Sequence, residues 1–289
     1  MENILEINGL NKAYKGFALK DVSFSLPKGF IMGFVGQNGS GKTTTIRSIL
    51  NMANIDSGSI GVLGMDSIKD SIAIKQRTGV VFDSLYMAAH LNVTKLEKQL
   101  SPFYKDWDSQ GFQRRIKDFG LPVDKPVGDF SKGMKMKLMI AVALSHNAEF
   151  IILDEPTSGL DPVARDELLD ILSEFIEDEN RGVLFSTHIT ADVERIADYI
   201  TILHNGSVWY SGTKDELAEN FLVIKGDETN LAPDLKLHCI GFHAYRNGFD
   251  ALISTQYRSI IPDSLVTEKA SIDEILVYIA KEDKNERHS

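Results

Sequence analysis

Short apolar runs alternate with amphipathic stretches along most of the chain. The nearly continuous apolar runs occupy residues 30–35, 80–82, 150–153 and 183–185. Such runs are typical of strands that are buried on both faces of a parallel sheet. Residues 45–52 and 131–144 instead carry apolar side chains at helical spacing. Strands that alternate with helices predict an α/β fold with a mostly parallel sheet covered by helices on both faces.

Antiparallel strands are predicted at both ends of this region. Residues 4–10 and 22–26 form an N-terminal antiparallel β element, and the second segment alternates apolar and serine side chains. Between them, residues 11–14 are expected to form a loop that exposes Tyr14. Farther along, Asn205-Gly206 between two apolar runs predicts a β-hairpin, because both residues tolerate the positive φ angles of its tight turn.

The pattern changes twice along the chain. Residues 84–145 have mainly helical periodicity broken by Gly and Pro, which predicts a helical subdomain inserted into a domain of residues 1–220. Residues 221–289 are expected to form a small C-terminal α/β module, either a stabilising extension or a dimerisation or regulatory module. A Ser-Ile-Asp-Glu capping box at residues 271–274 begins its helix. Its strand candidates are residues 222–224, 235–240 and 251–253.

One stretch between a predicted strand and a predicted helix matches the phosphate-binding pattern GxxxxGK[ST]. It consists of Gly36, Gln37, Asn38, Gly39, Ser40, Gly41, Lys42, Thr43 and Thr44. Glycines let backbone N–H groups approach phosphate oxygens, and the following helix N-terminus adds partial positive charge. Lys42 is expected to contact the outer phosphates and Thr43 to bind Mg²⁺. The stretch therefore predicts a P-loop that binds nucleotide phosphates.

A second motif lies where the apolar run 150–153 ends in Asp154 and Glu155. Side chains at the carboxyl end of a parallel strand face the ligand crevice of an α/β sheet. Asp154 suits Mg²⁺, directly or through water, and Glu155 is placed to orient and deprotonate an attacking water. Together with the P-loop, this pair predicts hydrolysis of a bound nucleotide with Mg²⁺.

These motifs resemble those of the nucleotide-binding subunits of ABC (ATP-binding cassette) transporters, and the resemblance covers about residues 4–212. Ser158-Gly159-Leu160-Asp161 resembles the family's D-loop, and His188 after Ser186-Thr187 resembles its switch histidine. Phe130-Ser131-Lys132-Gly133-Met134 resembles the family signature, and Tyr14 stands where the family stacks an aromatic ring on adenine.

The resemblance implies how these residues act. Catalysis would involve Glu155, His188 and Asp161, while Ser131 and Gly133 would join the P-loop in binding nucleotide. Two ATPase subunits would sandwich two ATP molecules head-to-tail, each between the P-loop of one and the signature of the other. The second subunit would be the same or a different chain. An integral membrane permease would be the other partner, and the chain would lie in the cytoplasm against the inner face of the cell membrane.

Two departures from the family pattern affect dimer closure and turnover. Asp83 stands where the family usually has glutamine, and it is expected to reach Mg²⁺ or a water. In the signature, Lys132 replaces a glycine and Met134 replaces the glutamine. With these changes and its short C-terminal module, the chain resembles the ATPases of bacterial peptide and antibiotic exporters. The stretch 84–93 would either receive the permease or form helical-subdomain core.

Charge, cysteine content and hydropathy limit the kinds of partner that the chain is expected to have. The net charge of -10 and pI ≈ 5.2 argue against a basic nucleic-acid surface, so no nucleic-acid partner is expected. Cys239 is the only cysteine, which excludes an internal disulfide and fits a reducing cytoplasm. The start of the chain lacks signal-peptide features, and no apolar run approaches the ~18 residues of a membrane span. A membrane role would therefore act through a partner.

Two other functions remain compatible with the sequence. The first is a soluble ABC-type ATPase that acts on ribosomes or DNA, although one P-loop and the absence of heptads disfavour it. The second is a non-hydrolysing nucleotide switch. Asp83 and Lys132 leave the switch open, whereas Glu155 and His188 favour an enzyme.

Overall fold

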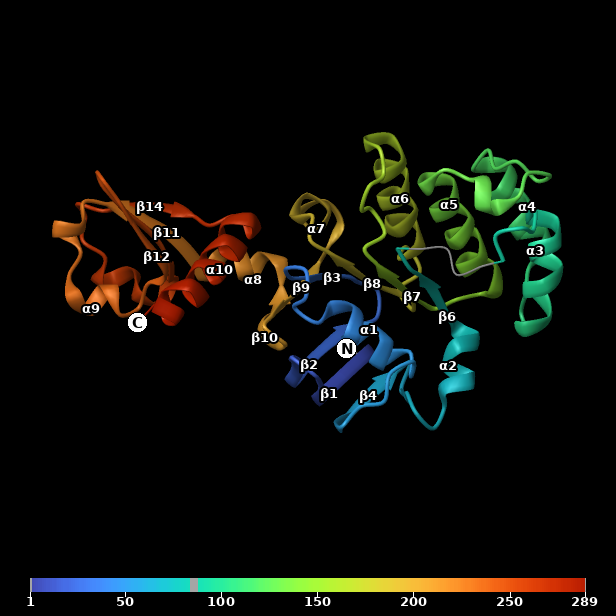
Figure 1. Ribbon diagram of the computed structural model, residues 1–289, viewed down its shortest axis with the longest axis horizontal. Helices are drawn as coiled ribbons and strands as arrows, with labels where there is room; N and C mark the ends of the chain where they lie inside the picture. The colour runs from blue at the N-terminus through green and yellow to red at the C-terminus, as the bar shows by residue number, and fades with distance from the viewer. Residues whose placement is uncertain (1, 84–87, 289) are drawn as a thin grey trace. The chain divides into compact units, whose positions relative to one another are not determined.

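The computed structural model describes residues 2–83 and 88–288 of the chain. Their contacts divide the chain into two compact units, Met1–Ser211 and Gly212–Ser289 (Figure 1). The sequence pattern predicts this boundary after residue 220 instead. Part of the stretch expected to receive a permease, residues 84–87, lies outside the described residues.

The core of the first unit is a sheet with the strand order β10-β9-β3-β8-β7-β6. Its strands are β3 (Ile31–Val35), β6 (Thr78–Val81), β7 (Phe150–Asp154), β8 (Gly182–Thr187), β9 (Tyr199–His204) and β10 (Ser207–Thr213). The pairs from β9 through β6 are parallel. Every residue of β3, β7 and β8 is buried, as the apolar runs predict. The parallel sheet brings the carboxyl ends of β3, β7 and β8 to one edge.

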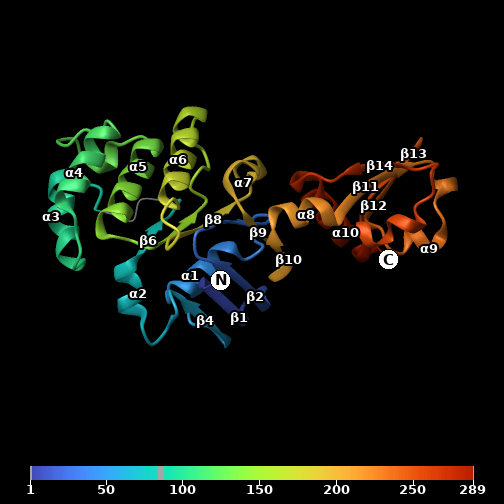
Figure 2. The same ribbon diagram turned by 180° about the vertical axis from the view of Figure 1, so that it is seen from behind.

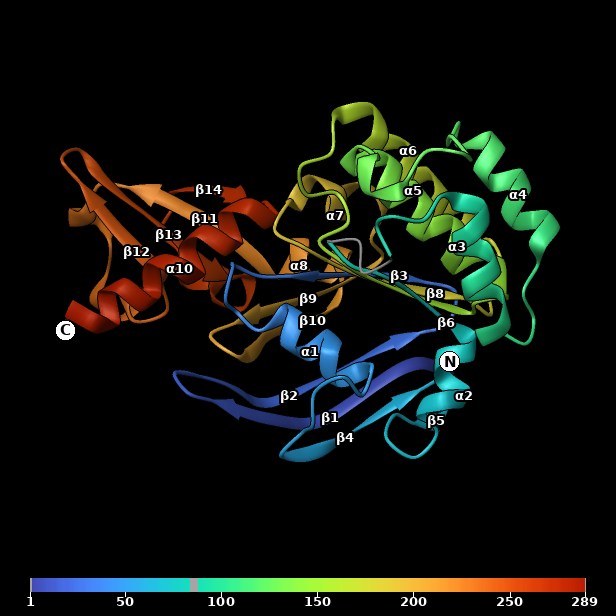
Figure 3. The ribbon, with the colours of Figure 1, turned by 45° about the vertical axis from the view of Figure 1, so that its right-hand side comes forward.

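A second, antiparallel sheet has the order β2-β1-β4-β5. Its strands are β1 (Asn3–Tyr14), β2 (Phe17–Pro27), β4 (Ser57–Val62) and β5 (Met65–Asp66). Helix α1 (Lys42–Ile49) lies between this sheet and the central one (Figure 3), and all three contribute to one apolar core. The expected loop at residues 11–14 is wrong, because β1 continues to Tyr14 and pairs there with Phe17. Pairing with β2 satisfies the backbone groups of this stretch although few of its side chains are apolar.

Helices cover the central sheet and form the predicted helical subdomain at one side of it (Figures 1 and 2). They are α2 (Ser71–Arg77), α3 (Val93–Leu100), α4 (Ser109–Asp118), α5 (Lys132–Ala143), α6 (Pro162–Phe175) and α7 (Thr190–Ile196). Residues of α3, α4 and α5 share a separate apolar core that includes Leu96, Phe112 and Leu138. None of the helices within the described ranges combines the length and apolar character needed to cross a membrane.

The second unit contains an antiparallel sheet with the order β12-β13-β11-β14. Its elements are α8 (Lys214–Asn220), β11 (Phe221–Gly226), α9 (Pro233–Lys236), β12 (Ile240–Tyr245), β13 (Gly248–Ser254), β14 (Val266–Lys269) and α10 (Ile272–His288). The predicted strand at residues 235–240 is wrong, because Pro233 starts a short helix and Leu235 is buried in the core. The predicted capping box is confirmed, since the Ser271 and Glu274 side chains each accept the other's backbone N–H.

Candidate active site

The P-loop joins the end of β3 to the start of α1 and depends on its glycines. Gly39 and Gly41 have φ values of +85° and +115°, which favour glycine. A Cβ atom on Gly41 would lie 2.6 Å from Leu19 Cδ2 and 2.8 Å from Phe17 Cζ. A side chain at position 41 would therefore have to displace these two side chains of β2 and adopt a backbone angle that favours glycine.

A hollow of about 440 Å³ opens over this loop. It is lined by Gly16, Phe17, Asn38, Gly39, Gly41, Lys42, Thr43, Thr44 and Glu155. The side chain of Thr43 is exposed. Helix α1 begins at Lys42, so its N-terminal N–H groups and partial positive charge lie at the hollow's wall. This arrangement suits an anion such as a phosphate group.

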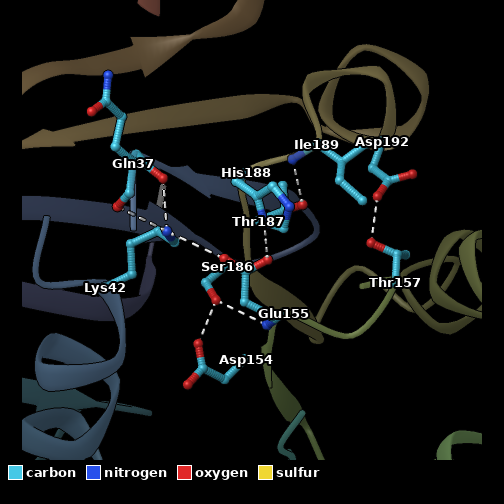
Figure 4. A network of polar contacts seen from close by, with 11 residues as sticks. Gln37, Lys42, Asp154, Glu155, Thr157, Ser186, Thr187, His188, Ile189 and Asp192 are labelled. Atoms are coloured by element: carbon cyan, nitrogen blue, oxygen red, sulfur yellow. Dashed lines mark hydrogen bonds and ion pairs between the residues drawn. The ribbon is translucent and has the colours of Figure 1, made fainter. Parts of the chain in front are cut away.

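Lys42 is almost fully buried, with only 6% of its side chain exposed, and its ammonium lies among oxygens. Nζ donates hydrogen bonds to the carbonyl oxygens of Gly36 at 2.7 Å and Gln37 at 3.4 Å (Figure 4). It also lies 3.2 Å from Glu155 Oε1. This ion pair connects the P-loop directly to the end of β7.

Glu155 has the backbone angle φ = 51°, which is strained for a residue with a side chain. Its N–H donates to the carbonyl oxygen of Ser186 at 3.1 Å and to Ser186 Oγ at 3.0 Å. Its Oε2 lies 2.7 Å from His188 Nδ1. Oε1 is buried and accepts no hydrogen bond from the described residues. The carboxylate is thus held between the Lys42 ammonium, which pairs with Oε1, and His188, which contacts Oε2.

Asp154 precedes Glu155 and is 5% exposed. Its Oδ1 accepts a hydrogen bond from Ser186 Oγ at 2.6 Å. Ser186 therefore contacts both acids of the motif, a role that no sequence motif indicates. The parallel register pairs Asp154 with Ser186, so strand alignment at the motif is the signal that could have found it.

The signature and D-loop residues lie together at the N-terminal ends of α5 and α6. Ser131 caps α5 by accepting the N–H of Met134 at 3.2 Å, and Asp161 caps α6 by accepting two backbone N–H groups. A Cβ atom on Gly133 would lie 3.4 Å from Ala164 Cβ, so the starts of the two helices are in contact. None of these residues is among the described residues that line the P-loop hollow.

Two further predicted site residues also lie apart from this hollow. Tyr14 is half exposed, and its ring centroid is 5.3 Å from Lys12 Nζ. Its neighbour across the strand pair, Phe17, lines the hollow instead. Asp83 lines a different hollow of about 510 Å³ together with Lys132. The nucleotide-binding and metal-binding roles of Tyr14 and Asp83 stay predictions.

Comparisons with known proteins agree with this geometry. Residues 19–158 match the family model described as ABC transporter. The chain is 35% identical to the ABC transporter ATP-binding protein NatA of Bacillus subtilis over 212 residues, covering 70% of this chain and 85% of that protein. It is 30% identical to the bacitracin transport ATP-binding protein BcrA of Bacillus licheniformis over 262 residues, 88% and 85% of the two chains. A solved structure of the ATP-binding subunit of an ABC transporter has a TM-score of 0.68 and 30% identity, covering 74% of this chain and 91% of its own.

Proposed function

Because the chain belongs to the ABC transporter family of ATP-binding proteins, we propose that it is the ATP-hydrolysing subunit of a membrane exporter. It is an ATPase of the kind that is coupled to transport. The observation that carries the proposal is the position of Glu155, whose carboxylate borders the P-loop hollow between Lys42 and His188.

Each of these groups has a role in hydrolysis. The P-loop N–H groups and the Lys42 ammonium bind the phosphates and offset their negative charge. His188 Nδ1 holds Oε2 of Glu155 at 2.7 Å and so fixes the carboxylate's orientation. When a phosphate takes over the Lys42 ammonium, Oε1 becomes free to accept the proton of a water that attacks the terminal phosphate, which makes Glu155 the general base.

The residues beside the loop also fit Mg²⁺. The ion prefers oxygen ligands, and the exposed Thr43 hydroxyl in the hollow's wall would supply one, with the Asp154 carboxylate at the end of β7 as a second ligand, directly or through water. Residues 2–83 and 88–288 contain no cluster of three or more His, Cys, Asp or Glu that could hold a metal. A magnesium site that shares its coordination with substrate phosphates needs no such cluster. When bound, the ion would neutralise charge on the phosphate oxygens.

The separate position of the signature supports a dimer. Ser131, Gly133 and Asp161 lie on the contacting starts of α5 and α6, outside the described lining of their own P-loop hollow. The exposed Ser131 and the N-terminal N–H groups of α5 would instead bind the nucleotide of a second ATPase subunit, head-to-tail. Tyr14 would lie against the adenine. A permease would complete the exporter and keep this chain on the inner face of the membrane.

One relative supports a proposal for the class of cargo. The matched protein of Bacillus licheniformis carries the name of a bacitracin transport protein. We therefore infer that the cargo of this chain's exporter is a peptide or an antibiotic, which the membrane subunit would recognise.

The test combines phosphate release with light scattering on wild type and Glu155→Gln. The variant should bind Mg·ATP and lose turnover by ~10²–10⁴-fold, because the general base is missing. Its mass in solution should shift from monomer to dimer when Mg·ATP is added. Near-normal turnover would remove Glu155 from its catalytic role, and a persistent monomer with bound ATP would contradict closure of a homodimer.

A further inference from the structure

Asp192 is a buried carboxylate that the proposed function does not use. It lies on α7 and is 0% exposed. Its Oδ2 accepts a hydrogen bond from the Thr157 hydroxyl at 2.6 Å (Figure 4), and its Oδ1 forms an ion pair with Arg165 Nε. All of these groups lie in the first unit, beside the candidate active site.

The two partners of Asp192 belong to segments that carry proposed catalytic residues. Thr157 is two residues beyond Glu155 and is 1% exposed. Arg165 lies one turn into α6, and its N–H donates to the carbonyl oxygen of Asp161 at 3.0 Å. Asp192 itself follows His188 by four residues. One carboxylate therefore joins the segments that hold Glu155, Asp161 and His188.

Stability alone does not explain why a buried charge connects these segments. An ionised carboxylate loses its hydration on burial, and apolar side chains of similar size often stabilise a core as well or better. A paired, buried charge instead restricts its partners to one arrangement. This restriction is important here because the strained backbone conformation of Glu155 persists only when the surrounding residues hold it in place. Ser186 holds this residue at its N–H, and the Thr157–Asp192 bond holds the chain that follows it.

We propose that Asp192 is a positioning residue for ATP hydrolysis. Its hydrogen bond to Thr157 keeps the Glu155 carboxylate in contact with His188. The carboxylate is then oriented so that it can accept a proton from the attacking water. This inference rests on the proposed role of Glu155. It adds a residue that contacts neither nucleotide nor water and acts only through the catalytic group.

Steady-state kinetics separate positioning from binding. In Asp192→Asn and Thr157→Val, kcat should fall at least ~10-fold while the KM for ATP changes less than about twofold, because a misplaced base slows chemistry without altering the P-loop. Thr157→Ser keeps the hydroxyl and should keep kcat. The matched control is Arg195→Gln, since Arg195 joins the same two helices through ion pairs with Asp166 and Asp170 at the surface. Its kcat should equal that of wild type.

A double-mutant cycle with Glu155→Gln gives the decisive readout. If Asp192 acts through Glu155, Asp192→Asn should not reduce further the residual single-turnover rate of Glu155→Gln. A reduction by the same factor in both backgrounds would overturn the inference. Thr157→Val supplies the same test if thermal unfolding shows that Asp192→Asn does not fold. Absence of turnover in wild type would refute the proposed function, whereas wild-type kcat in both folded variants would refute only the role of Asp192.

Discussion

Replacement of Ser186 by alanine removes the hydroxyl group that contacts both acids of the active site. Oγ donates to Asp154 Oδ1 at 2.6 Å and accepts the N–H of Glu155 at 3.0 Å. Both Ser186 and Asp154 are buried, so no water readily replaces the lost bond. A hydrogen bond to a charged group contributes about 1.5–3 kcal/mol, and its loss leaves the carboxylate less well satisfied. We therefore expect Ser186→Ala to lose about 2 kcal/mol of stability.

Thermal unfolding followed by circular dichroism measures this loss. For a domain of 150–250 residues, about 1 kcal/mol corresponds to about 2–4 °C, so Ser186→Ala should lower the Tm by about 4–8 °C. The first unit, Met1–Ser211, falls in this size range. The matched control is Ser48→Ala, which removes an equally buried hydroxyl that donates to a neutral acceptor, the carbonyl oxygen of Thr44, at 3.0 Å. That variant should lose about 1 kcal/mol or less. Equal Tm values for the two variants would refute the argument that the charged acceptor makes the Ser186 bond strong.

Three further predictions concern nucleotide binding, pH dependence and thiol reactivity. Lys42→Ala should weaken Mg·ATP binding in calorimetry, and an unchanged affinity would contradict the P-loop assignment. The bidentate contact with Arg77 lowers the pKa of Glu149 from its ordinary value of 4.5, so this pair stabilises the fold above that pH and the contribution disappears as the pH falls through the lowered pKa. Glu149→Gln should therefore unfold more easily than wild type at pH 7, by less than about 1 kcal/mol because both side chains are partly exposed, and the difference should shrink as the pH is lowered below 4.5. Burial raises the pKa of the Cys239 thiol to about 11, so Ellman's reagent should label it slowly at pH 8 in the native protein and rapidly in denaturant; fast native labelling would contradict this.

Local patterns made the central sheet and the P-loop predictable. The apolar run of β7 and the motif at residues 36–44 are contiguous in sequence, and each depends on the conformation of neighbouring residues. The cap of α5 was predictable for the same reason, because Ser131 lies directly before the helix that it caps. Patterns of this kind carry their own structural meaning, because strand burial, glycine turns and helix caps are short-range effects.

The contacts that complete the site depend on distant parts of the chain. The Lys42–Glu155 ion pair joins β7 to the P-loop, and Ser186 meets Asp154 only through strand pairing. The two errors have different origins. Residues 11–14 extend a strand because β2 supplies backbone partners for them, so tertiary pairing overrides the local pattern there. Residues 233–236 form a helix because Pro233 occupies its first turn, a local signal that the apolar spacing around Leu235 obscured.

The ion pair between Lys42 and Glu155 means that the Glu155 carboxylate competes with the nucleotide's phosphates for the Lys42 ammonium. A phosphate that binds the Lys42 ammonium must share it with, or take it from, a carboxylate oxygen 3.2 Å away. The measured affinity is then the intrinsic affinity of the loop reduced by the cost of separating the pair. After cleavage the same carboxylate can return to the ammonium as the terminal phosphate leaves. Glu155 would thus link the speed of the chemical step to the residence time of the product.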